Sequence, residues 1–98
     1  MASGDSRVFK GAYVGTAAEL SIEAPGFKPS SVTIIPADGS SFSQHIEGMD
    51  DGTCFNQKAG TSSKIASQAI TLDDNGFNVG TNADLNTDGS TYFYICSQ

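Results

Sequence analysis

The chain has 98 residues and a formal net charge of −6, with 11 glycines and a hydrophobic share of 38%. This length fits one small domain, and the composition favours a turn-rich β domain over a helical one. The chain has no run of about 18 apolar residues that could span a membrane. Its five basic residues are too few to neutralise a row of phosphates, which argues against a nucleic-acid partner.

The N-terminal segment MASGDSR, residues 1–7, lacks the basic and apolar regions of a signal peptide. It is predicted to be a flexible arm. The rest of the chain, residues 8–98, is predicted to form a single domain.

Strand patterns separated by turn signals fill the first part of this domain. Residues 8–14, VFKGAYV, mix β-branched and aromatic side chains, and residues 18–24, AELSIEA, alternate between apolar and polar. The segment PGFKP, residues 25–29, interrupts the chain because proline fixes φ and glycine frees it. The apolar run SVTIIP, residues 31–36, predicts a central strand.

Alternation returns in SFSQHIE, residues 41–47, through Phe42, Gln44 and Ile46. His45, the sole histidine, falls on the other face of this predicted strand. A solvated or packing role is predicted for His45 rather than that of a catalytic base.

The following segments are less regular. Residues 48–63 are predicted to be a long loop. In KIASQAITL, residues 64–72, the apolar residues fit one face of a helix, whereas Ile70 and Leu72 fit a strand, so both readings stay open. NGFNVG, residues 75–80, predicts a short strand between turns.

The last predicted strand is STYFYICS, residues 90–97. Tyr92 and Tyr94 fall on one face of it, and Phe93 and Ile95 fall on the other. A strand that is apolar on both faces is either central in its sheet or covered by a neighbouring subunit.

Six or seven such strands with frequent turns predict an all-β fold, a small antiparallel β-sandwich of about 6–8 short strands. Gly76 and Gly89 are expected to supply positive φ at its hairpin turns.

One motif suggests an ion. DLNTDGSTY, residues 84–92, places Asp84, Asn86 and Asp88 as in the opening of an EF-hand calcium loop. Position 12 of that loop requires a bidentate glutamate, and here it is Ile95. A full EF-hand is therefore excluded, and a polar loop with an Asp-Gly turn is favoured over a looser oxygen cage.

The two cysteines, Cys54 and Cys96, lie far apart and outside any CxxC or Cys/His cluster, which argues against zinc. Free thiols are favoured, and a disulfide stays open.

Catalytic motifs are missing from the sequence. It contains no G-x-S-x-G, P-loop or G-x-G-x-x-G motif. The pairs Asp50-Asp51 and Asp73-Asp74 sit beside turn residues, and adjacent strand side chains point to opposite faces. No enzyme activity, catalytic residue, metal site or cofactor is therefore predicted.

Two stretches, APGFKPSSVTIIP and ITLDDNGFNVGTNADLNTDGSTYFYIC, resemble a module that recurs in phage virion and tail-fibre proteins. Its pattern begins G-F-x-P-x-x-V-x-I-K and ends D-x-D-G-F-x-x-G-x-x-x-x-x-N-x-x-G-x-T-Y-V-A-W-C-W. The matching residues are Gly26, Phe27, Pro29, Val32, Ile34, Asp73, Gly76, Phe77, Gly80, Asn86, Gly89, Thr91, Tyr92 and Cys96. Asn75 stands where the pattern has Asp, and Ile95 and Ser97 stand where it has Trp.

The resemblance implies a β-sandwich structural module without catalysis. The chain, expected to be a whole polypeptide starting at Met1, is interpreted as a capsid decoration (cement) protein made in the host cytoplasm. Its expected place is the outer capsid surface of the virion, bound to the major capsid protein as a homotrimer or other homo-oligomer.

An alternative is a tail or fibre-tip module that binds a host glycan or protein. Such a site needs exposed aromatic side chains with polar neighbours. The candidates are Tyr13, Phe42 and Phe55, although core packing is the simpler expectation for each.

Overall fold

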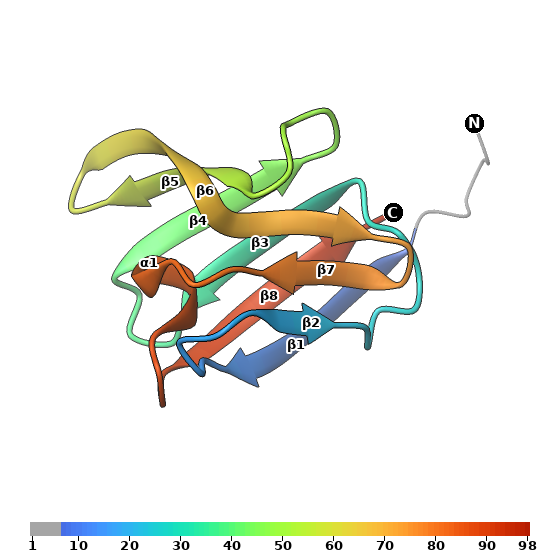
Figure 1. Cartoon of the computed structure of the whole chain (residues 1–98), viewed down its shortest axis with the longest axis horizontal. Helices are drawn as coiled ribbons and strands as arrows, with labels where there is room; N and C mark the ends of the chain where they lie inside the picture. The colour runs from blue at the N-terminus through green and yellow to red at the C-terminus, as the bar shows by residue number, and fades with distance from the viewer. Residues whose placement is uncertain (1–6) are drawn as a thin grey trace.

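The computed structural model describes residues 7–98 (Figure 1). It contains eight strands and one single-turn helix. In chain order they are β1 (Val8–Val14), β2 (Leu20–Ile22), β3 (Ser31–Pro36), β4 (Ser41–Ile46), β5 (Thr53–Lys58), β6 (Thr61–Asp73), β7 (Gly76–Val79), α1 (Ala83–Asn86) and β8 (Thr91–Ser97). α1 is too short to cross a membrane, and it is the one helix in this range.

The strands form one sheet in the order β1-β8-β3-β4-β5-β6-β7-β2, and all neighbours are antiparallel. The predicted all-β antiparallel fold is confirmed, with the strands joined in one continuous sheet. This sheet curls, so that β2, β7 and β6 lie in front of β1, β8 and β3 (Figure 1). The ring of Phe77 on β7 meets Tyr94 on β8 edge-on at 5.1 Å, although four strands separate β7 from β8 in the sheet.

The core lies inside the curl. Its aromatic part consists of Tyr13, Tyr92, Tyr94 and Phe77, and the Tyr13 and Tyr92 rings stack at 5.2 Å. Phe77 is fully buried, as is Val79 two residues later on the same side of β7. Burial of these rings supplies much of the apolar area that stabilises so small a domain.

Of the predicted N-terminal arm, only Arg7 belongs to the described residues. Its carbonyl oxygen accepts a 2.8 Å hydrogen bond from the backbone N–H of Gln98. Its guanidinium lies 5.9 Å from the centre of the Phe27 ring. Arg7 thus contacts the body of the domain.

The predicted long loop over residues 48–63 is wrong in part, because it contains β5 and the start of β6. The two strands join at Ala59 and Gly60, which both have positive φ, 52° and 79°. Positive φ at both positions is typical of the tight type I′ hairpin turn. The sequence signal was weak because this turn usually carries Asn-Gly rather than Ala-Gly.

The ambiguous segment KIASQAITL lies in β6, where it is strand with an interruption. Cys54 pairs with Ile65, but the preceding Thr53 pairs with Ile70, so residues 66–69 form a bulge. Gln68 in the bulge has a φ of 59°. The bulge shifts the alternation of apolar residues, which explains why the sequence pattern was compatible with both a helix and a strand.

In β4 the polar side chains face the core, and the apolar side chains face outward. Ser41, Ser43 and His45 are buried, whereas Phe42 is partly exposed and Ile46 is 50% exposed. Two of these buried polar side chains have partners on β5: Asn56 donates a 2.9 Å hydrogen bond to Ser43 Oγ, and His45 Nδ1 donates one of 2.7 Å to the Thr53 carbonyl. The third, Ser41 Oγ, has no hydrogen-bond partner among the described residues. The packing role predicted for His45 is confirmed, and the solvated one is wrong.

Candidate functional site

The sheet side that faces away from the core on β1, β8, β3, β4 and β5 is unusually apolar. We call this side the outer face, and it lies at the back in Figure 1. Its side chains are those of Val8, Lys10, Ala12, Val14, Thr33, Ile35, Phe42, Gln44, Ile46, Phe55, Gln57, Thr91, Phe93 and Ile95. They alternate with the buried residues because successive strand side chains point to opposite sides.

Strand pairing gathers the apolar groups of the outer face. Ala12 on β1 pairs with Phe93 on β8, and Phe93 pairs with Ile35 on β3. Phe93 is 53% exposed and Ile35 is 38% exposed, and the neighbouring Ile95 is 42% exposed. A contiguous apolar surface of this kind usually marks a contact site.

The sequence had placed Phe93 and Ile95 correctly on one face of the last strand. β8 lies between β1 and β3, so its position inside the sheet is as predicted. Its outer side nevertheless stays uncovered in the single chain. β8 therefore has a hydrogen-bonded strand on each side, but nothing packs on its outer side chains.

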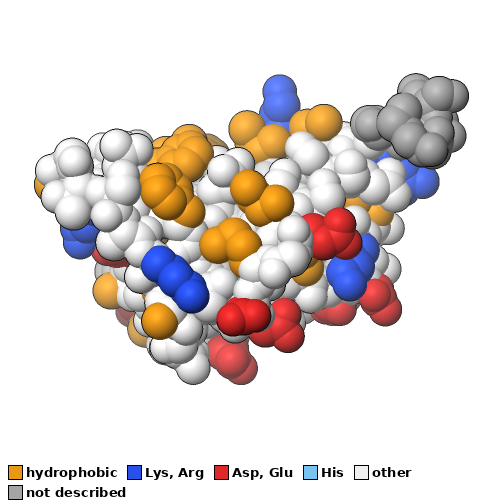
Figure 2. Space-filling view, turned by 90° about the horizontal axis from the view of Figure 1, so that it is seen from above, with side chains coloured by type: hydrophobic (Ala, Val, Ile, Leu, Met, Phe, Trp, Pro, Cys, Tyr) orange, Lys and Arg blue, Asp and Glu red, His pale blue; other side chains and the backbone are white. Residues whose placement is uncertain are grey.

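The outer face carries no negative charge. The five strands that build it contain no Asp or Glu, although the whole chain has 11. Its one charged side chain is Lys10 on β1, and the cross-strand row through Lys10 continues beyond the outer face to Lys64 on β6. In the view from above, hydrophobic side chains lie across the middle and upper part of the molecule, and acidic side chains lie mainly along its lower edge (Figure 2).

The structure places the three aromatic candidates for host binding on two different sides of the sheet. Tyr13 is a core residue, whose hydroxyl donates a 2.7 Å hydrogen bond to the Leu85 carbonyl. Phe42 and Phe55 lie instead on the outer face, so the expectation that they pack in the core is wrong. Each pairs across β4 and β5 with an amide side chain, Phe42 with Gln57 and Phe55 with Gln44.

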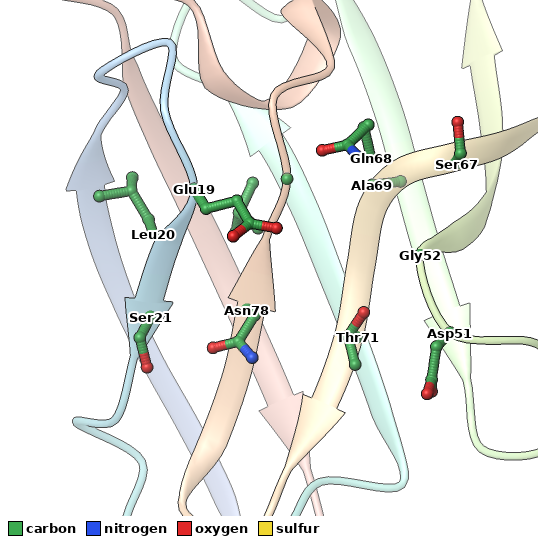
Figure 3. Close-up of a pocket in the computed structure, with 12 residues that line it drawn as sticks. Glu19, Leu20, Ser21, Asp51, Gly52, Ser67, Gln68, Ala69, Thr71 and Asn78 are labelled. Carbon is green, nitrogen blue, oxygen red and sulfur yellow. The ribbon is translucent and has the colours of Figure 1, made fainter.

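A depression of about 540 Å³ lies on the opposite face of the molecule, over the outward-facing side of β2, β7 and β6 (Figure 1). Figure 3 shows Ser21, Asn78 and Thr71 on these three strands, with Glu19 above Asn78 and Asp51 beyond Thr71. The lining contains no histidine, cysteine, lysine or aromatic residue. Its hydroxyl, amide and carboxylate groups make a polar surface without an arranged nucleophile and base.

The residues of the calcium-like motif serve separate structural roles. Asn86 is buried, and its side-chain N–H groups donate to the carbonyls of Ala18 at 2.6 Å and Gly80 at 2.8 Å. Its side-chain oxygen accepts the Thr16 N–H at 2.8 Å. This oxygen is therefore committed to the backbone, and Asn86 ties three chain segments together.

The two acidic residues of the motif do not share the surroundings of Asn86. Asp84 forms a 2.9 Å ion pair with Lys58, while Asp88 is exposed in a turn. Gly89 follows with a φ of 82°, which confirms the predicted Asp-Gly turn. The sequence missed α1, the single helical turn that Asn82 caps by accepting the Asp84 N–H at 2.9 Å.

Cys54 and Cys96 are buried free thiols, as the favoured prediction stated. Both point into the core on strands β5 and β8, which β3 and β4 separate. Three strand spacings of about 4.8 Å lie between them, well beyond the roughly 7 Å limit for bridged Cα atoms. Burial raises the pKa of Cys54 to about 11 and that of Cys96 to about 12, which makes both thiols unreactive.

Comparison of the chain with protein-family models, curated proteins and solved structures gave no match.

Proposed function

We propose that this chain is a non-enzymatic structural protein of a phage virion, a capsid decoration (cement) protein that docks on the outer head surface through its outer face. The observation that carries the proposal is the uncovered apolar surface around Phe93, Ile35 and Ile95. Its sequence motive is the resemblance to the virion module.

The outer face has the composition of a contact site for another protein. Aromatic and aliphatic side chains form its centre, where binding energy usually concentrates. Lys10 lies at one end of the outer face and Lys64 of β6 lies just beyond the other end, and both would favour a capsid surface with acidic groups around an apolar centre. The absence of acidic side chains from these strands reduces the local repulsion between the outer face and acidic groups of a partner, although the net charge of the chain is −6.

The proposed assembly is a homo-oligomer, a trimer or another closed form, that contacts several copies of the major capsid protein. Closed symmetry is the rule for soluble homo-oligomers. Several linked contacts bind more tightly than one, so each copy needs only a modest interface.

The test uses purified particles of the phage that encodes this chain. Quantitative mass spectrometry of heads and tails should find many copies on heads. Particles that lack the protein should keep their shape but lose infectivity faster on heating or osmotic shock. Protein added back should restore resistance. Restoration should fail for Phe93→Ser and succeed for Asn78→Ser, a change to the same residue on β7, on the opposite face of the molecule.

A second candidate, a tail or fibre-tip module that recognises a host glycan or protein, is favoured by one observation. The Phe42/Gln57 and Gln44/Phe55 pairs set exposed rings beside amide groups, the mixture that a sugar-binding surface uses. A few copies at the tail tip, with particles that fail to adsorb without them, would contradict decoration and support this candidate. Phe55→Ala should then abolish glycan binding.

A further inference from the structure

The two ends of the sheet differ in how well they are protected. Edge strands expose unpaired backbone groups, and proteins usually blunt them with short strands, proline or charge. The edge strand β2 has three residues, and Pro25 follows soon after it. The edge strand β1 has seven residues, with no proline and Lys10 as its one charge.

Hydrogen bonds at both ends of β1 identify which of its backbone groups are free. The Arg7 carbonyl accepts the Gln98 N–H at 2.8 Å, and the Gly15 N–H donates to the Ser90 carbonyl at 2.8 Å. Bonded residues alternate along an antiparallel strand, so the odd-numbered residues of β1 bond to β8. The N–H and C=O groups of the even-numbered residues point away from β8. No strand in the described range pairs with that side of β1.

We propose that this free edge pairs with β1 of a second copy, antiparallel, about a two-fold axis at Gly11. Val8 then lies opposite the partner's Val14, and Lys10 lies opposite the partner's Ala12. All four residues with free backbone groups on each copy gain partners. The sheet becomes continuous through the dimer.

The sequence of β1 selects this register over its neighbours. A shift of two residues in one direction places Lys10 opposite the partner's Lys10, and like charges directly opposite each other are destabilising. A shift of two in the other direction leaves Val8 without a partner in the strand. A shift of one residue would turn the partner's outer face toward the core side.

Side chains on both sides of the strand suit the same register. Toward the core, the partly buried Phe9 lies opposite the partner's Tyr13, and such aromatic cross-strand pairs are favourable. Gly11 on the axis brings no side chain, and its place is filled by the Tyr94 ring, whose hydroxyl oxygen lies 2.6 Å from the position of an added Cβ. On the outer side, the cross-strand row that contains Phe93 and Ala12 continues into the second copy, where the partner's Lys10 follows. The pairing follows from the backbone of β1 and does not depend on capsid binding.

The test measures association of the full chain by sedimentation velocity over a wide concentration range. The native chain should show a concentration-dependent dimer. Ala12→Lys places a lysine opposite the partner's Lys10 and should raise the dimer dissociation constant at least about tenfold. Ala12→Glu, at the same exposed position, places a carboxylate there and should leave the constant unchanged or lower it.

Two further variants separate this dimer from other assemblies. Ala12→Pro removes a backbone N–H that the single chain does not use, so it should abolish the dimer while the melting temperature stays close to that of the native chain. Phe93→Ser, in the middle of the outer face, should leave the dimer intact. A monomer at all concentrations, a trimer, or a dimer that Phe93→Ser destroys and Ala12→Lys does not would overturn the proposal.

Discussion

At the scale of single residues, Gly76 shows how closely two strands approach. Its φ is not positive, which corrects the prediction of a turn glycine. An added Cβ would instead collide with the Ile22 carbonyl oxygen of the neighbouring β2. The position therefore needs glycine because backbone fills the space where a side chain would start.

We expect Gly76→Ala to destabilise the protein by about 2–3 kcal/mol, in the range of overpacked sites, because β2 and β7 must move apart. Urea unfolding followed by circular dichroism measures the change. Ser21→Ala, an exposed change on the same strand pair, should stay within about 0.5 kcal/mol. Equal stability of Gly76→Ala and the native chain would contradict the close approach.

Asn86 holds the turn that precedes β8. Asn86→Ala removes three side-chain hydrogen bonds and leaves backbone groups of Thr16, Ala18 and Gly80 without their partner. We expect a loss of about 2–3 kcal/mol in the free energy of unfolding, since unsatisfied buried groups are costly. Asp88→Ala, in the exposed part of the same motif, should change stability little.

The same pair of variants tests the motif for calcium. Because an ion that binds only the folded state must raise its stability, thermal melts with calcium and with a chelator are informative. We expect equal melting temperatures. A rise of several degrees in millimolar calcium that Asp88→Ala abolishes would show that the loop binds the ion.

The buried thiols are expected to make the stability of the folded protein depend on pH in the alkaline range. The unfolded chain loses thiol protons near pH 8.5, whereas the folded state keeps them because burial raises the pKa of Cys54 to about 11 and of Cys96 to about 12. The unfolded state thus binds fewer protons, and stability falls as the pH rises above about 8.5. Melting temperatures between pH 8 and pH 10.5 should fall, and less steeply for Cys96→Val. A slope unchanged by this substitution would show that Cys96 does not contribute.

At the scale of elements, the β5–β6 hairpin depends on a strained turn. Ala59 takes a left-handed conformation that costs a residue with a Cβ roughly 1–2 kcal/mol, and Asn tolerates it better. Ala59→Asn creates the preferred Asn-Gly pair of a type I′ turn. We expect it to raise stability by about 0.5–1 kcal/mol, measured as a higher urea midpoint. A lower midpoint would mean that this turn is not of that type.

At the scale of the whole molecule, the residues that stabilise the fold differ from those proposed to contact a partner. Phe77 is fully buried, whereas Phe93 is 53% exposed on the outer face. We expect Phe77→Ala to cost about 3–5 kcal/mol, and Phe93→Ser to cost under about 1 kcal/mol because little buried area is lost in the single chain. Chemical denaturation of both variants gives the comparison. A large loss for Phe93→Ser would mean that this residue supports the fold rather than a contact.

Local pattern was sufficient to predict most strands. The β-branched, aromatic and apolar runs in residues 8–14, 31–36 and 90–97 predicted strands at those positions, because such side chains favour strands. Alternation predicted the strand in residues 41–47, because a half-buried strand needs its apolar side chains at every second residue. The Asp-Gly turn at residue 88 was equally readable, since few residues accept positive φ.

Tertiary structure alone decided which side of each strand enters the core. Period-2 alternation defines two faces but does not say which is inside, and in β4 the polar face is buried because Asn56 and the Thr53 carbonyl satisfy Ser43 and His45. Phe42 was thereby turned outward, to join Ile35 and residues from distant strands in the outer face. That surface exists only in the curled sheet, since strand pairing between segments far apart in the chain, such as β3 with β8, brings its members together.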